Sequence, residues 1–100
     1  MSNFEEQKRG LWEAALSKVR HDLDQMPEKD RPQLKEIADK HFPLLVSEIL
    51  EAKEKFKAST DLPTAGHFSG RYAVLNRKLF RNVSLAILGV DIKDQPPNPR

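Results

Sequence analysis

Apolar residues recur at helical spacing along most of the chain. The first stripe advances by four and three residues in alternation and comprises Trp12, Leu16, Val19, Leu23 and Met26. This spacing places all five side chains on one face of a helix. Pro27 ends the stripe, because proline cannot continue a helix. We therefore predict a helix over residues 3–26, which at about 1.5 Å per residue is roughly 36 Å long and implies an elongated molecule.

A second apolar stripe runs from Leu34 to Phe56 and is interrupted by a proline. Pro32 precedes the stripe at a position in the first helical turn, where its missing N–H costs nothing. Pro43 lies inside the stripe, and a proline disfavours helical geometry at the residue before it. The pattern predicts either one helix kinked at Pro43 or two helices, over residues 31–41 and 43–58, that meet at Phe42.

The last third of the chain contains a predicted loop, a third helix and a tail. Residues 59–66, with Pro63 and Gly66, are typical of a loop. A third helical stripe follows and ends before Gly89, which suits a left-handed C-terminal cap. A strand over residues 83–87 is the alternative, because β-branched residues alternate there with smaller ones. Residues 93–100 hold three prolines, a composition that predicts a disordered tail.

These elements predict the fold class. The chain has 100 residues, of which 38% are hydrophobic and 32% charged, a balance typical of one globular domain. We expect an all-α, small elongated bundle of three or four helices, with the second helix kinked or broken at Pro43. Residues 1–92 form the single domain and residues 93–100 the tail.

Composition narrows the environment and excludes several chemistries. The chain has no cysteine, which excludes disulfides and thiolate metal sites and fits a reducing compartment. No apolar stretch approaches the roughly 20 residues that span a bilayer. No basic segment leads into an apolar one near the first residue, so no secretory signal is expected. We expect a cytoplasmic protein without a membrane segment.

No motif predicts catalysis, a cofactor or a metal ion. Ser69 lies between Gly66 and Gly70, but the serine is one place late for a Gly-x-Ser-x-Gly nucleophile turn. The histidines occupy separate segments, and none has a second histidine three or four residues away to share a metal ion. The glycines match neither phosphate-binding loop pattern. We therefore expect a non-catalytic protein without cofactors.

Charge is distributed unevenly and indicates one candidate surface. The net charge is +2, yet residues 1–60 carry −1 (eleven bases, twelve acids) and residues 61–100 carry +3 (six bases, three acids). No acid occurs between Leu62 and Val90. Helical spacing brings Arg71, Lys78 and Arg81 close to one line, with Arg77 beside Arg81. The rings of His67, Phe68 and Tyr72 are expected nearby. The candidate binding residues are His67, Arg71, Tyr72, Arg77, Lys78 and Arg81.

Three interpretations of the basic segment stay open. Its charges can neutralise acids on the other helices of the same chain, bind an acidic protein, or contact nucleic-acid phosphates. Residues 33–40 resemble the first helix of a helix-turn-helix in their Leu-x-x-Ile-Ala face. However, Phe42 and Pro43 stand where a glycine turn is expected, and the next helix carries Glu48, Glu51 and Glu54. Those acids would repel phosphates.

Apolar residues are in surplus at the end of the third helix. Residues 83–90 are apolar except for Ser84 and Gly89, and such a helix needs cover on every side. The cover can come from the bundle itself or from a second copy, so a homodimer is one expectation. We predict a module that binds an acidic protein through an apolar face bordered by basic residues, with a small nucleic-acid regulator as the alternative.

Overall fold

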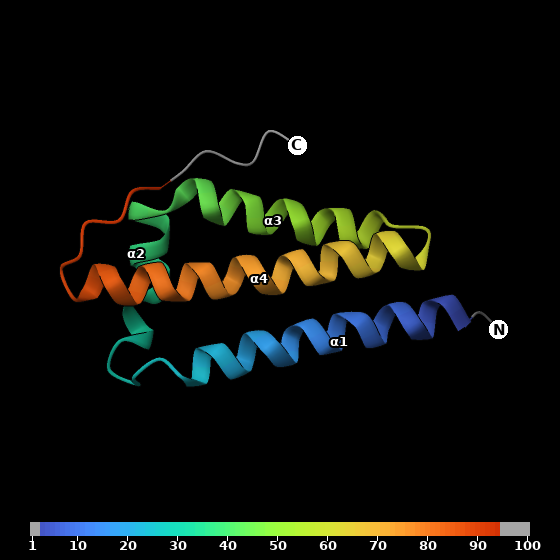
Figure 1. The fold of residues 1–100 in the computed structure, drawn as a ribbon, viewed down its shortest axis with the longest axis horizontal. Helices are drawn as coiled ribbons and strands as arrows, with labels where there is room; N and C mark the ends of the chain where they lie inside the picture. Colours follow the sequence, from blue (N-terminus) through green and yellow to red (C-terminus); the bar gives the residue numbers. More distant parts are fainter. Residues whose placement is uncertain (1–2, 95–100) are drawn as a thin grey trace.

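The computed structural model describes residues 3–94, and its regular structure is helical throughout. It contains α1 (Asn3–Asp24), a 3₁₀ turn (Arg31–Gln33), α2 (Leu34–His41), α3 (Pro43–Ala58) and α4 (Leu62–Ile87), as Figure 1 shows. The predicted all-α bundle is confirmed, and the alternative of a strand over residues 83–87 is wrong. The molecule measures 51 × 31 × 15 Å, so the predicted elongation is also confirmed.

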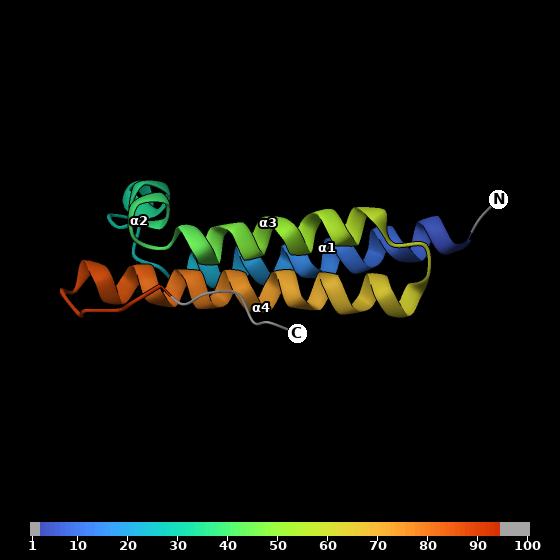
Figure 2. The same ribbon diagram turned by 90° about the horizontal axis from the view of Figure 1, so that it is seen from above.

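The longest helix, α4, occupies the centre of the bundle. It packs against α1 on one side and α3 on the other. The short helix α2 crosses behind the C-terminal half of α4 and contacts both α3 and α4 (Figures 1 and 2). One long side of α4 is therefore left without a covering helix.

The break between α2 and α3 is confirmed at the predicted residue. Phe42 leaves helical geometry, with φ −131° and ψ 46°, as expected before a proline. Its N–H still donates to Ala38 O at 2.9 Å, and its carbonyl accepts from Val46 N at 3.0 Å. Its ring is 0% exposed and lies in the core. The bend therefore serves packing, because it directs this aromatic ring into the bundle.

An aromatic cluster joins the three long helices away from α2. The Trp12 ring of α1 stacks on Phe56 of α3, with centroids 4.8 Å apart, and lies 4.6 Å from the Tyr72 ring of α4. Beside it, Lys8 Nζ donates to the backbone oxygens of Lys57 and Ser59, each at 2.9 Å. These carbonyls lie at the C-terminus of α3, where a cation is favourable. α1 and α3 are thus tied together at this end.

The predicted loop over residues 59–66 is mostly wrong, because α4 begins at Leu62. Asp61 acts as the N-cap: its carboxylate accepts from Thr64 N at 2.8 Å and from Thr64 Oγ1 at 3.0 Å. Pro63 lies in the first turn, where a proline is tolerated. Gly66 lies inside the helix. The two residues interpreted as breakers therefore belong to α4, and the connection is short.

The C-terminus of α4 has the predicted glycine cap. Gly89 adopts φ 88°, its N–H donates to Ala86 O, and Val90 N–H donates to Leu85 O, which is the Schellman pattern. The chain then returns toward α3, where the Asp94 carboxylate accepts from Leu44 N and Leu45 N at 2.6 and 3.3 Å. Of the predicted tail, Lys93 and Asp94 are described, and residues 95–100 lie outside the described part.

Candidate functional site

The solvent-exposed residues of α4 form one stripe along its uncovered side. They recur every three or four residues, which places them on a single helical face. We call this stripe the outer face of α4; it comprises Pro63, His67, Gly70, Val74, Arg77, Lys78 and Arg81. It contains no acid. The bases of the outer face, Arg77, Lys78 and Arg81, lie together in the C-terminal half of α4.

Two of the predicted arginines are neutralised by acids of neighbouring helices. Arg71 pairs with Glu48 of α3, and the Glu48 side chain is only 11% exposed. Arg77 pairs with Asp22 of α1, with Nε to Oδ2 at 3.0 Å and Nη2 to Oδ1 at 3.3 Å. The hydrogen bond and the charge of Asp22 raise the pKa of Arg77. The two pairs mark the borders of the outer face toward α3 and α1.

Lys78 and Arg81 keep their charges available to solvent. Both are exposed, and neither forms an ion pair within residues 3–94. Val74 lies one helical turn before Lys78 and is 67% exposed. Its neighbours three or four residues away include Arg71, Arg77 and Lys78. The centre of the outer face is therefore an exposed apolar side chain bordered by bases.

The two predicted aromatic residues do not act together. Tyr72 lies on the opposite side of α4 and packs against Trp12 and the core, so its ring does not join the outer face. His67 does lie on that face, with its ring edge-on to Phe68 at 4.8 Å. Helical geometry explains the separation, because five residues place two side chains about 140° apart.

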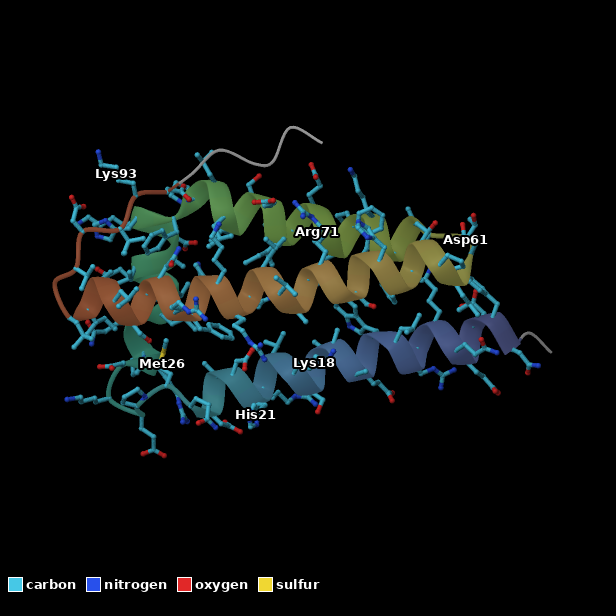
Figure 3. The ribbon with its side chains drawn as sticks, viewed as in Figure 1. Lys18, His21, Met26, Asp61, Arg71 and Lys93 are labelled. Atoms are coloured by element: carbon cyan, nitrogen blue, oxygen red, sulfur yellow. The ribbon has the colours of Figure 1, made fainter. Side chains whose placement is uncertain are left out.

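A cleft of about 550 Å³ opens between α3, α4 and the returning C-terminal segment. We call it the α3–α4 cleft. Its lining combines apolar and charged residues, among them Arg71 of α4 and Lys93 of the returning segment, both labelled in Figure 3. Lys78 and Val74 of the outer face also line it. Sequence reasoning missed Lys93 because it lies in the predicted tail, and missed Asn82 because an isolated asparagine carries no pattern.

The serine and histidine side chains considered for catalysis or metal binding do not form a site. Ser69 Oγ donates to Gly66 O at 3.1 Å within α4. His21, His41 and His67 belong to α1, α2 and α4 respectively. Within residues 3–94 no three histidines or acids lie close enough together to hold a metal ion. No helix in this part of the chain is both long and apolar enough to cross a bilayer.

Comparison with protein-family models, curated proteins and solved structures found no match to this chain. Functional inference therefore depends on the chemistry of the outer face and the α3–α4 cleft.

Proposed function

We propose that this protein is a non-catalytic binding module whose outer face of α4 binds an acidic protein partner. The observation that carries the proposal is the composition of this face. Every exposed residue of α4 lies on one stripe without acids, and Lys78 and Arg81 have no partner there among residues 3–94. Complementary charge accelerates encounter with an acidic surface and disfavours basic partners.

An apolar centre favours a protein over other anions. Val74 is largely exposed between basic neighbours, and burying its side chain against a partner would remove apolar surface from water. Phosphate groups offer no such apolar contact. Arg81 can contribute a planar guanidinium that pairs with a carboxylate through two hydrogen bonds. A helix that presents acidic and apolar residues on one face, three or four positions apart, would satisfy both requirements.

The alternative, binding to nucleic acid through the same bases, is weakened by the two internal ion pairs. Arg71 and Arg77 already contact Glu48 and Asp22, which leaves Lys78 and Arg81 as the unpaired bases of the outer face. Each phosphate contact adds about −0.9 to the slope of log affinity against log salt. Two contacts would give a slope of about −2 and weak, non-specific binding.

Titration with two probes tests the proposal. The ¹⁵N-labelled full chain is titrated with a 20-residue amphipathic helix of glutamate, leucine and alanine, and separately with a 20-base-pair DNA duplex. We expect saturable shifts of the Val74, Lys78 and Arg81 amides with the peptide, because its acids and leucines match the face. DNA should bind more weakly at about 0.15 M salt.

A matched pair of variants identifies the surface. Lys78→Glu/Arg81→Glu reverses two charges on the outer face, whereas Lys29→Glu/Lys40→Glu reverses two exposed lysines elsewhere; both lower the net charge of +2 by four. Peptide affinity should fall at least tenfold in the first variant and less than threefold in the second, since contact pairs outweigh screened distant charges. Equal losses, or tighter binding to DNA than to peptide, would contradict the proposal.

A further inference from the structure

The acids of the α3–α4 cleft are already satisfied by the protein. Glu48 pairs with Arg71 across the cleft. Asp94 accepts two hydrogen bonds from backbone N–H groups at the start of α3, Leu44 N and Leu45 N, where the helix dipole also favours a negative charge. Both carboxylates therefore have partners within the protein, although Asp94 keeps its negative charge beside Lys93.

Three polar side chains of the cleft have no such partners. Lys78 and Lys93 are exposed and form no ion pair within the described chain. The Asn82 amide, one turn after Lys78 on α4, likewise takes part in none of the side-chain hydrogen bonds found there. Lys78, Asn82 and Lys93 thus border one cleft and offer hydrogen-bond donors suited to a carboxylate. In Figure 3 the Lys93 side chain extends away from α3 and α4, so its ammonium has to turn toward the cleft to reach a bound anion.

The rest of the lining is apolar. Leu45 of α3, Leu75 of α4 and Ile92 of the returning segment contribute to it, and Leu45 and Leu75 are buried core residues. A volume of about 550 Å³ lies within the usual range for ligand sites, about 300–1,000 Å³. The space therefore suits a carboxylate attached to an apolar group rather than a single small ion.

The one arginine of the cleft is not free to pair with a bound anion. An arginine fork binds either a carboxylate or a phosphate through two parallel hydrogen bonds. In this cleft the one arginine, Arg71, is held by Glu48. The remaining lysines act as single point charges and need no particular anion geometry.

From this geometry we propose that the partner inserts a glutamate or aspartate, adjacent to an apolar side chain, into the α3–α4 cleft. The carboxylate is held by Lys78, Lys93 and the Asn82 amide, and the apolar side chain contacts Leu75 and Ile92. This inference rests on the proposed function, because it specifies how the acidic partner of α4 is anchored.

A short peptide and its neutral analogue test the anchor. The ¹⁵N-labelled full chain is titrated with acetyl-Ala-Leu-Glu-Leu-Ala-amide and with the same peptide carrying glutamine for glutamate. We expect saturable amide shifts at Leu75, Asn82 and Lys93 with the acidic peptide. The glutamine peptide should bind about fivefold to tenfold more weakly, since it loses partly exposed ion pairs with two lysines.

A lysine outside the outer face separates this inference from the proposed function. Lys93→Gln should weaken binding of the acidic peptide about threefold and leave the glutamine peptide unaffected. Lys40→Gln, an exposed lysine of α2 on the far side of α4, is the matched control and should change neither.

Two results would overturn the anchor. Shifts confined to Arg81 and other outer-face residues, with equal affinity for both peptides, would exclude the cleft and leave the proposed function standing. An absence of saturable shifts with the short peptide would exclude the cleft as well. The proposed function itself is contradicted by its own test if the longer acidic helix fails to bind the outer face.

Discussion

Single residues at the helix ends determine where the long helices begin and end. Asp61 illustrates this, because its carboxylate accepts both the backbone N–H and the hydroxyl of Thr64. The backbone hydrogen bond, followed by the hydroxyl hydrogen bond, lowers the pKa of Asp61 below its usual 3.8. One capping side chain thus starts a 26-residue helix despite Pro63 and Gly66.

Substitution of Asp61 should lower stability in a pH-dependent way. Asp61→Ala removes the cap and should lower Tm by a few degrees at about pH 7. Because the pKa is lowered in the folded state, the charged cap stabilises fully above the unfolded value of 3.8 and progressively less as pH falls below it. Thermal melts of the wild type, Asp61→Ala and Asp61→Asn measure this. Asp61→Asn keeps a cap that does not titrate, so identical pH profiles for wild type and Asp61→Asn would contradict the assignment.

The pair between Arg71 and Glu48 removes one predicted base from the binding surface. A double-mutant cycle with Arg71→Gln and Glu48→Gln should give a coupling free energy of about 1 kcal/mol, because both side chains are largely shielded from solvent. Urea unfolding of the four proteins measures it. Single-variant effects that add to within about 0.3 kcal/mol would show that the pair contributes no coupling.

At the scale of elements, the spacing of apolar residues predicted the helices correctly. The wrong boundary arose where capping side chains at a helix end were not taken into account. The break at Phe42 followed from Pro43, and the cap at Gly89 from its freedom to adopt positive φ. The loop over residues 59–66 was wrong because a proline in a first turn supports a helix when a capping acid precedes it. The sequence contains the capping residue Asp61 as well as Pro63 and Gly66, and the cap allows the helix to begin before the two residues that usually disfavour helix.

The candidate site was predictable only in part. The acid-free segment is evident in the sequence, and its helical spacing correctly placed Lys78 and Arg81 on one exposed face. The partners of Arg71 and Arg77 lie 23 and 55 residues away, so only tertiary packing brings them close. The same holds for Asp94, which contacts α3 across about 50 residues.

Phe42 should contribute more to the stability of the α2–α3 junction than any other side chain there. Its ring is completely buried at the break, so Phe42→Ala should lower the free energy of unfolding by about 3–5 kcal/mol. Leu50→Ala, on α3 and 56% exposed, should cost about 0.5 kcal/mol or less. Urea denaturation compares the two. Similar losses would contradict the assigned core.

The whole molecule combines a closed core with two features that face solvent. Val83 is fully buried within the bundle, whereas Leu88 and Val90 beyond α4 are exposed, Leu88 to 77%. The apolar surplus in the sequence is thus covered internally only in part, by the burial of Val83 and the partial burial of Ala86 and Ile87 against the core. We call the exposed pair, Leu88 and Val90, the apolar end; Leu88 lies about two helical turns beyond Arg81.

The homodimer stays a prediction, with the apolar end as its contact. Light scattering after size exclusion should give about twice the monomer mass of 11.5 kDa. Leu88→Asp should restore the monomer, since it places a charge in an apolar contact. Lys78→Glu/Arg81→Glu should leave the mass unchanged. A mass of 11.5 kDa at all concentrations would contradict the dimer.

The central claim is that the outer face of α4 binds an acidic protein, and purification from the native host tests it most directly. The untagged wild type, Lys78→Glu/Arg81→Glu and the control Lys29→Glu/Lys40→Glu are purified in parallel, and the co-purifying molecules are identified. We predict one acidic protein with the wild type and the control, and its loss with the outer-face variant. Recovery of nucleic acid without a protein, or of the same protein with all three, would contradict the claim.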